Sequence, residues 1–258
     1  MSVSDTVHLS SRDNPLLKEL RRLAQDNGAY RKLGRVWLEG DHLCRAALAR
    51  GRTPALAVFS ESFWPLAQDW SRHAAIKNIV VAEALWAELS GLESPAPMGF
   101  VLDLPPAGGV QAGVATVLLD RVQDAGNVGS ILRSAAAFGF AQVVALKGTA
   151  ALWAPKVLRA GMGAHFGLRL VEGVELPALD VLRVPLLVTS SHQGELLHRA
   201  TLPWPCAWVM GHEGQGVSPA LEALAAQRIR ITQPGGEESL NVAAAAAICL
   251  HASAAGQA

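Results

Sequence analysis

Short apolar runs alternate with helix-like segments throughout the second half of the chain. The runs have the pattern of buried strands, and most are followed by a polar or glycine-rich loop. Asn127 is expected to cap a helix over 127–138, Ser218 and Pro219 to open another, and an alanine-rich helix to follow Asn241. This alternation predicts an α/β domain with a mostly parallel sheet. The predicted strands cover 114–119, 142–146, 184–189, 207–210 and 228–231.

The first half of the chain shows a similar alternation on a smaller scale. Apolar residues at helical or strand-like spacing predict the elements, and a proline- and glycine-rich stretch then breaks the pattern. We therefore expect a smaller α/β domain over 1–104, a linker over 105–113 and a second domain over 114–258. The predicted elements of the first domain are helices at 14–27 and 41–50, strands at 35–39, 55–59, 78–81 and 100–104, and a helical stretch between the second and third strands.

The composition suits a globular protein with an uneven distribution of charge. The chain has 258 residues, half of them apolar, which suffices for one large or two ordinary domains. Its formal net charge is zero, but residues 1–52 carry ten lysines and arginines against six aspartates and glutamates. This basic segment favours nucleic-acid binding, although a solvated helix face explains the charge at least as well. The candidate contact residues are Lys18, Arg21, Arg22, Arg31, Lys32 and Arg35.

Cysteine usage and hydropathy bear on where the protein works. Three widely spaced cysteines favour a reducing, intracellular setting, so we expect a cytoplasmic protein. The polar amino terminus does not have the pattern of a signal peptide, and no apolar run of about eighteen residues predicts a membrane span. The histidines and cysteines show no metal-ligand spacing, so we expect neither a metal nor a membrane partner.

The first of three loops that carry candidate chemistry covers 120–133. Asn127, Gly129 and Arg133 have the spacing N-x-G-x-x-x-R. Gly129 lets the backbone approach a bulky partner, and the guanidinium of Arg133 can grip a phosphate with two hydrogen bonds. Taken alone, a helix cap followed by a surface arginine explains this loop better.

The second and third loops also follow predicted strands. The second, 211–216, reads GHEGQG; its backbone can cradle a nucleotide, and Glu213 suits a cationic or hydroxyl-bearing ligand. It lacks the Lys-Ser/Thr of a phosphate loop and the G-x-G-x-x-G of a dinucleotide fold. The third, 231–241, ends in Ser239 and Asn241 before the alanine-rich helix. Ser239 lacks the sequence context of a nucleophilic serine.

The three loops, in this order and at these spacings, resemble the SpoU (TrmH-like) branch of the SPOUT methyltransferases over about 114–252. The segment RAGMGA at 159–164 is similar to an intermediate motif of that family, and WLEG at 37–40 is loosely similar to the substrate-binding domain fused to many members. The chain departs from the family pattern at four positions but retains the polar residues of all three motifs. These departures are Ala125, Gly161, His212 and Thr232.

The resemblance implies transfer of a methyl group from S-adenosylmethionine to a ribose 2′-hydroxyl in RNA. The additional amino-terminal domain favours ribosomal RNA over transfer RNA. The resemblance also implies that the carboxyl-terminal domain contains a deep trefoil knot, an exception to unknotted topology, and that two subunits form a homodimer to complete the sites.

The resemblance further assigns roles to single residues. Arg133 would be catalytic, and we interpret it as a phosphate clamp and alkoxide stabiliser because a guanidinium stays protonated in proteins. Asn127 would position Arg133 or the ribose, and Glu213 would fix the second loop. Ser239 and Asn241 would orient substrate and cofactor. Groups that hold the cofactor would come from Thr189, Met210, Gly211, Gly216, Ile231, Leu240 and Asn241.

Two other classes of protein predict different features. A non-catalytic RNA-binding or ribosome-assembly protein on the same fold would bind the cofactor without turnover. A nicotinamide-dependent oxidoreductase predicts a G-x-G-x-x-G turn after the first strand, and residues 120–129 do not supply one.

Overall fold

The computed structural model describes residues 6–67, 70, 77–106, 108–190, 193–235 and 239–257. Its contacts divide them into two units. Unit 1 comprises the described residues up to Pro106 together with Trp153–Phe166, and unit 2 comprises the other described residues. The sequence prediction counted 153–166 with the second domain, whereas its contacts lie with unit 1. The predicted linker, 105–113, includes Ala107, which lies outside the described residues.

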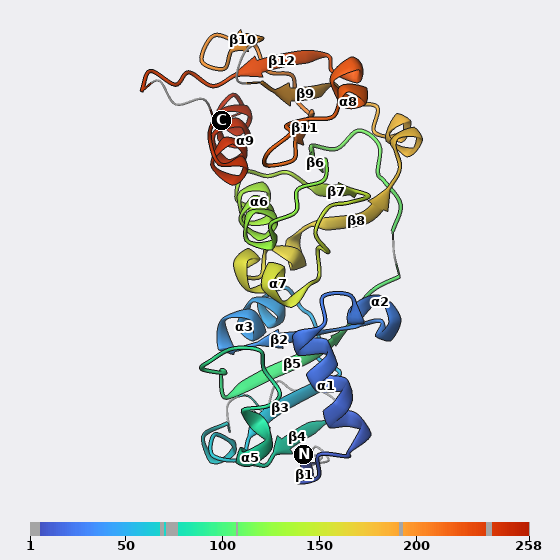
Figure 1. Cartoon of the computed structure of the whole chain (residues 1–258), viewed down its shortest axis with the longest axis vertical. Coiled ribbons are helices and arrows are strands. Elements are labelled where there is room, and N and C mark those ends of the chain that lie inside the picture. Colours follow the sequence, from blue (N-terminus) through green and yellow to red (C-terminus); the bar gives the residue numbers. More distant parts are fainter. Residues whose placement is uncertain are drawn as a thin grey trace. The chain divides into compact units, whose positions relative to one another are not determined.

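Unit 1 is built on a five-stranded mixed sheet with strand order β1-β4-β3-β5-β2 (Figure 1). The strands β1, β4 and β3 run parallel, and β5 runs antiparallel to both β3 and β2. The helix α1 begins after Asn14, whose side chain accepts a hydrogen bond from Leu16 N, and it buries Leu17, Leu20 and Leu23. The strands are β1 (Thr6–Leu9), β2 (Arg35–Glu39), β3 (Leu56–Ser60), β4 (Asn78–Val81) and β5 (Met98–Asp103). The helices are α1 (Pro15–Gln25), α2 (Ala29–Leu33), α3 (Asp41–Ala49), α5 (Glu83–Trp86) and α7 (Pro155–Gly161).

The sequence predicted the long elements of unit 1 better than the short ones. The strands at 35–39 and 78–81 are confirmed with identical bounds. The prediction missed β1, α2, α5 and α7, which are too short to show a clear period. The helical stretch predicted between β3 and β4 falls largely on residues outside the described ones, and Trp64–Leu66 forms a short 3₁₀ helix.

Unit 2 contains a seven-stranded sheet with strand order β10-β12-β9-β11-β6-β7-β8. All neighbouring pairs of these strands are parallel, which confirms the predicted mostly parallel sheet. The strands are β6 (Thr116–Leu119), β7 (Gln142–Leu146), β8 (Arg169–Val174), β9 (Leu186–Thr189), β10 (Glu195–Leu196), β11 (Ala207–Met210) and β12 (Gln227–Arg230). The helices are α6 (Ala125–Ala137), α8 (Pro219–Leu224) and α9 (Val242–Ala255), with a 3₁₀ helix at Leu176–Val181.

The strand register brings the carboxyl ends of four strands to one edge of this sheet. Leu119 at the end of β6 pairs with Met210 at the end of β11, and Thr189 at the end of β9 pairs with Ile229 of β12. From β6 the chain steps outward to β7 and β8, then crosses to β9 on the other side of β6 and β11. Parallel sheets bind ligands where the direction of the crossovers reverses. The loops after β6, β9, β11 and β12 therefore meet at the edge where a site is expected.

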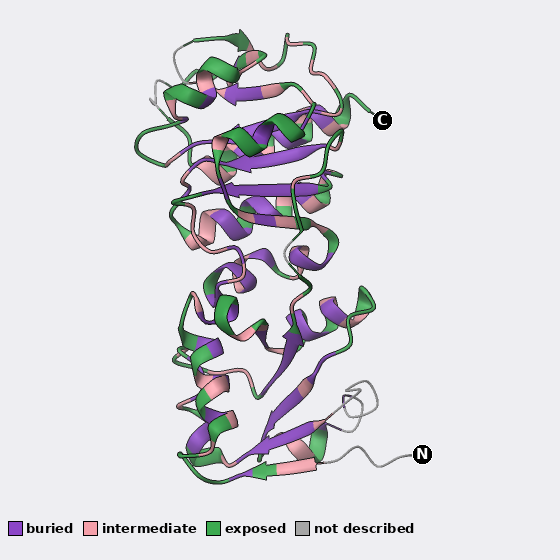
Figure 2. Ribbon diagram, turned by 90° about the vertical axis from the view of Figure 1, so that its right-hand side faces the viewer, coloured by how far each residue is buried: buried purple, intermediate pink, exposed green. Residues whose placement is uncertain are grey.

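The strands form the buried centre of unit 2, and helices α6 and α9 lie side by side against it (Figures 1 and 2). The indole Nε1 of Trp208, in β11, donates a hydrogen bond of 2.8 Å to Ser253 Oγ of α9. This bond fixes the last helix to the middle of the sheet. None of the described helices combines the length and the apolarity needed to cross a membrane.

Candidate functional site

A cavity of about 590 Å³ opens in unit 2 at the carboxyl ends of β9, β11 and β12. Its wall is formed by the loops that follow these strands and by the first turn of α9. All but one of the predicted cofactor-binding residues line it, namely Thr189, Gly211, Gly216, Ile231, Leu240 and Asn241. Met210 is fully buried in β11 and is not among the lining residues; its carbonyl accepts a 2.8 Å hydrogen bond from Asp120 N.

Three side chains join the three loops in a continuous chain of hydrogen bonds. Asn241 Nδ2 donates to Asn127 Oδ1 at 3.0 Å, and Asn127 Nδ2 donates to Glu213 Oε1 at 3.1 Å. Because a carboxylate can only accept, this arrangement fixes which end of each amide faces which partner. Side chains separated by more than eighty residues in sequence therefore meet beside one cavity.

The position of Asn127 corrects one sequence prediction. Asp124, not Asn127, is the N-cap of α6, and its Oδ1 accepts from Asn127 N at 2.8 Å. The predicted cap is wrong because Asn127 lies in the first turn of the helix, which leaves its side chain available for Glu213 and Asn241. Asn241 is the N-cap of α9, and its Oδ1 accepts from Ala243 N and Ala244 N. Ser218 precedes α8 as predicted, but its side chain makes no capping hydrogen bond.

Glu213 is held as a carboxylate. Burial raises the pKa of its carboxyl, but hydrogen bonds from the backbone N–H groups of Asp124 and Gln123 and from Asn127 outweigh burial, so the pKa lies below its ordinary value. The two backbone bonds measure 3.0 Å and 3.1 Å. A carboxylate with a lowered pKa and three donors does not take up a proton near neutral pH. Glu213 therefore serves to fasten the second loop to the first.

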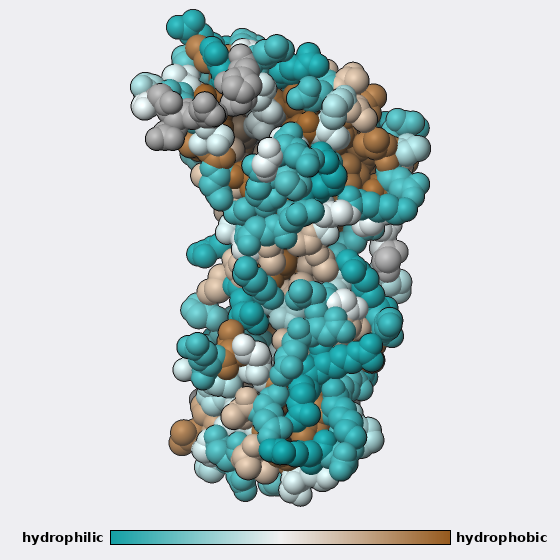
Figure 3. Space-filling view, viewed as in Figure 1, coloured by the Kyte–Doolittle hydropathy of each residue, from teal (hydrophilic) through white to brown (hydrophobic). Residues whose placement is uncertain are grey.

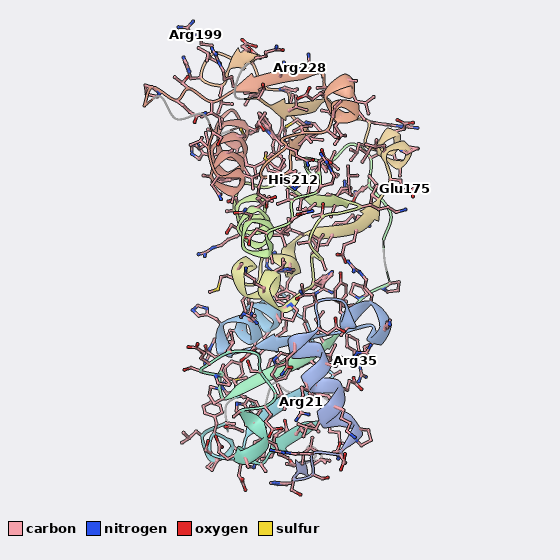
Figure 4. All side chains as sticks on the ribbon, in the orientation of Figure 1. Arg21, Arg35, Glu175, Arg199, His212 and Arg228 are labelled. Carbon is pink, nitrogen blue, oxygen red and sulfur yellow. The ribbon has the colours of Figure 1, made fainter. Side chains whose placement is uncertain are left out.

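The glycine-rich second loop folds into a tight turn around His212, whose position is labelled in Figure 4. The backbone of His212 exchanges two hydrogen bonds with Gly216, and its ring Nδ1 accepts from Gly214 N and Gln215 N. The imidazole nitrogen thus closes the turn from within, which gives this departure from the family pattern a structural role. A Cβ on Gly211 would lie 2.3 Å from Gly216 C, so only glycine fits there.

The two remaining catalytic candidates have polar groups available for a ligand. Ser239 lines the cavity, and Arg133 lies exposed on α6, outside the cavity lining. Within the described part of the chain, neither side chain has a hydrogen-bonding or ionic partner. The structure therefore brings Asn127, Glu213, Ser239 and Asn241 together beside the cavity and does not place Arg133 in its wall.

Sequence reasoning missed several polar side chains of the cavity, among them Ser190, Gln215, Glu222 and Gln233. Gln233 follows β12 by three residues, and its Oε1 is buried without a hydrogen-bond partner among the described residues. Its position just after a predicted strand could have identified it, because ligands bind at the carboxyl ends of parallel strands. Glu222 lies in α8 and carried no such signal. No cluster of His, Cys, Asp and Glu suited to a metal ion occurs within the described ranges.

The predicted nucleic-acid contacts lie in unit 1, where the surface over α1 is hydrophilic (Figures 3 and 4). Four of them already form ion pairs: Lys18 with Asp13, Arg21 with Glu88, Arg22 with Asp26, and Arg35 with Glu19 and Asp103. Arg31 lies over the ring of Tyr30, and Lys32 is exposed. The positive charge of this surface is thus largely balanced by acidic neighbours.

Comparisons of the sequence and the structure with known proteins identify a family. The model of the "SpoU rRNA Methylase family" matches residues 115–251. A Synechocystis sp. protein named as an uncharacterized tRNA/rRNA methyltransferase is 30% identical, over 96% of this chain and 93% of its own length. The Bacillus subtilis 23S rRNA (guanosine(2553)-2′-O)-methyltransferase RlmP is 29% identical over 94% and 97%. The solved structure of the SpoU methyltransferase AviRb from Streptomyces viridochromogenes, in complex with AdoMet, has a TM-score of 0.82 at 22% identity, covers 95% and 99% of the two chains, and shows the shared fold.

Proposed function

The chain belongs to the SpoU rRNA methylase family, and we propose that this RNA methyltransferase acts on a ribose 2′-hydroxyl, with ribosomal RNA as its favoured substrate. The observation that carries the proposal is the junction of three distant loops through Asn241, Asn127 and Glu213 beside one cavity. The relative RlmP, which is named as a 2′-O-methyltransferase of 23S rRNA, supports the choice of both atom and substrate.

The cavity fits S-adenosylmethionine, which supplies an activated methyl group when bound. About 590 Å³ lies within the usual range for sites of small ligands. Ile231 and Leu240 offer apolar contact for the adenine ring, and the backbone of Gly211 and Gly216 offers polar groups without side-chain bulk. The Oε1 of Gln233, which has no hydrogen-bond partner among the described residues, can accept a hydrogen bond from an amino group.

A ribose hydroxyl is a very weak acid, so the site must stabilise the negative charge that develops on its oxygen. Arg133 is the cation we assign to this task, and its planar guanidinium can also grip a flanking phosphate. Ser239 has a hydroxyl that can orient the ribose. Asn127, Asn241 and Glu213 act through the loops they hold, because their hydrogen-bonding groups are already engaged with one another and with backbone. The proton leaves to a phosphate or to water.

The surface of α9 supports a homodimer. This helix is apolar apart from His251 and Ser253, yet Ile248 is 41% exposed and shares one helix face with Ala244, His251 and Ala255. A helix that is apolar all round is expected to be buried, so a second copy of the chain is the partner we propose for this face. Arg133 lies on the neighbouring helix α6, where such a partner could complete its surroundings.

We also assign a trefoil knot to unit 2 and substrate RNA binding to unit 1. Ile231, Gln233 and Ser239 line the cavity at the carboxyl ends of β9 and β11, and α9 packs beside α6 and β11, an arrangement that suits threading of the carboxyl terminus. The exposed cations on α1 and α2 would contact RNA phosphates, and those that form ion pairs with acidic residues would break these pairs to do so.

Titration calorimetry combined with a methyl-transfer assay tests the proposed function. The protein should bind S-adenosylmethionine and transfer labelled methyl groups to ribosomal RNA. Gly211→Ala should lose binding, because its new Cβ would collide with the backbone at Gly216. Gly109→Ala is a matched control, since a Cβ there meets no atom within 4 Å. Binding without turnover on any RNA would favour the non-catalytic alternative, and absence of binding in folded protein would overturn the proposal.

A further inference from the structure

Arg121, the second residue after β6, has a left-handed backbone conformation. Its φ is 59°, in a region that side chains rarely adopt and where glycine would be unstrained. The turn at 148–149 lies against it: Arg121 N donates to Thr149 Oγ1 at 3.1 Å, and a Cβ on Gly148 would come within 3.2 Å of Arg121 Cγ. Residues held in such a strained backbone conformation cluster at functional sites, so the conformation of Arg121 points to a functional role.

The guanidinium of Arg121 joins a buried carboxylate to the wall of the cavity. Its Nε donates to Asp120 Oδ1 at 3.0 Å, and its Nη1 donates to Gln215 Oε1 at 3.0 Å. Asp120 is 2% exposed, and its Oδ2 also accepts from Ser218 N at 2.6 Å. Gln215 lines the cavity. Arg121 thus holds the second loop at Gln215, and Asp120 holds Ser218, just beyond that loop.

The same segment of the first loop holds Glu213 through the backbone N–H groups of Gln123 and Asp124. The second loop contains three glycines in six residues and would otherwise sample many conformations. Its position therefore depends on hydrogen bonds from residues 120–124. Through Gln215 and Glu213, these bonds fix two side chains of the cavity wall.

We infer that Arg121 is a positioning residue for the cofactor cavity. Its guanidinium, oriented by Asp120, holds Gln215 and the second loop in the conformation that binds S-adenosylmethionine. This inference rests on the proposed function, because it takes S-adenosylmethionine as the ligand of the cavity. Direct contact between Arg121 and an RNA phosphate is a separate possibility that the experiment distinguishes, and the geometry disfavours it because both sides of the guanidinium already have partners.

Four variants test the inference: Arg121→Gly, Gln215→Ala, the double variant, and Arg183→Gly as a matched control. Arg183 also has a left-handed conformation, with φ 50°, and does not line the cavity. Glycine relieves backbone strain at either position, but Arg121→Gly also removes the ion pair with the buried Asp120, so binding is measured at a temperature at which thermal unfolding shows every variant to be folded. By calorimetry, Arg121→Gly and Gln215→Ala should each bind S-adenosylmethionine about three- to tenfold more weakly. The double variant should bind no more weakly than the weaker single variant.

Hydrogen exchange gives a second readout. Amides of residues 211–217 should exchange faster in Arg121→Gly and at the wild-type rate in Arg183→Gly. If the wild type itself does not bind S-adenosylmethionine, the proposed function fails. If the wild type binds and Arg121→Gly binds equally well with unchanged exchange, the positioning role is wrong. Retained cofactor affinity with weakened RNA binding would assign Arg121 to a phosphate instead and also overturn the inference.

Discussion

Most of the polar side chains that the motifs identified form hydrogen bonds with one another. Asn127 uses both ends of its amide, Asn241 caps a helix while bonding to Asn127, and Glu213 accepts three hydrogen bonds. The sequence identified these residues because their types and order matched a family. It could not show that they form a scaffold, because hydrogen-bond partners more than eighty residues apart leave no local pattern. Only Arg133 and Ser239 are left with polar groups for substrate within the described chain.

Glu213→Gln tests the role of the carboxylate through its pH dependence. The pKa of Glu213 is lowered from an ordinary value of 4.5 in the folded protein. Its contribution to stability is therefore complete above that ordinary value and is lost as pH falls through the lowered folded pKa. The wild type should unfold at a higher temperature than Glu213→Gln at about pH 7, and the difference should shrink towards about pH 3.5. Thermal unfolding across this range measures it, and a difference that grows on acidification would contradict the assignment.

Asn127 and Arg133 should separate cofactor binding from chemistry. Asn127→Ala removes two side-chain hydrogen bonds, each worth about 1 kcal/mol and more for the one to the carboxylate, so affinity for S-adenosylmethionine should fall about tenfold or more. Arg133→Ala should leave that affinity nearly unchanged and abolish methyl transfer, and Arg133→Lys should stay poor because a point charge cannot reproduce the planar fork.

Calorimetry and a transfer assay on the same preparations give both quantities. Full transfer activity in Arg133→Ala would remove Arg133 from the reaction. A lysine variant whose rate rises through the lysine pKa would instead favour a general-base role at this position.

At the scale of elements, the pattern of hydrophobic residues predicted the helices and strands with a regular apolar pattern and missed the short or irregular ones. The strands β7 and β11 were predicted with identical bounds, because both are apolar runs interrupted only by Gln142 at the start of β7. The strand β8 was missed because four of its six residues are partly or fully exposed, and β10 because two residues show no period. The order of strands in the sheet depends on crossovers, which no local pattern encodes.

The exposed face of α9 leads to a prediction about assembly. Ile248→Glu places a charge at the centre of that face, where burial against a second copy would be costly. The variant should be monomeric under conditions where the wild type is dimeric, as measured by sedimentation or light scattering. Leu224→Glu is the control, because Leu224 is 54% exposed on α8, outside this face. A wild-type protein that is monomeric at all concentrations would contradict the homodimer.

For the whole molecule, the uneven charge of the sequence and the ion pairs of the structure lead to a quantitative expectation. Because at least four of the six candidate cations are already paired with acidic residues in the described part of the chain, few counterions should be released when unit 1 binds RNA. Replacing Arg22, Arg31 and Lys32 with Gln should weaken RNA binding and flatten its salt dependence between about 50 and about 200 mM salt, with unchanged cofactor affinity.

The matched control for this charge change is the replacement of Arg183, Arg199 and Arg228, all in unit 2, with Gln. Equal losses of RNA affinity in the two triple variants would show that unit 1 has no special part in binding RNA.

The central claim is that this chain methylates a ribose 2′-hydroxyl, and analysis of the product tests it most directly. Ribosomal RNA is incubated with the protein and S-adenosylmethionine labelled in the methyl group, then hydrolysed in alkali. A methylated 2′-oxygen cannot attack the neighbouring phosphate, so the label should appear in alkali-resistant dinucleotides, and Arg133→Ala should yield none. Label recovered in mononucleotides would place the methyl group on a base and contradict the account.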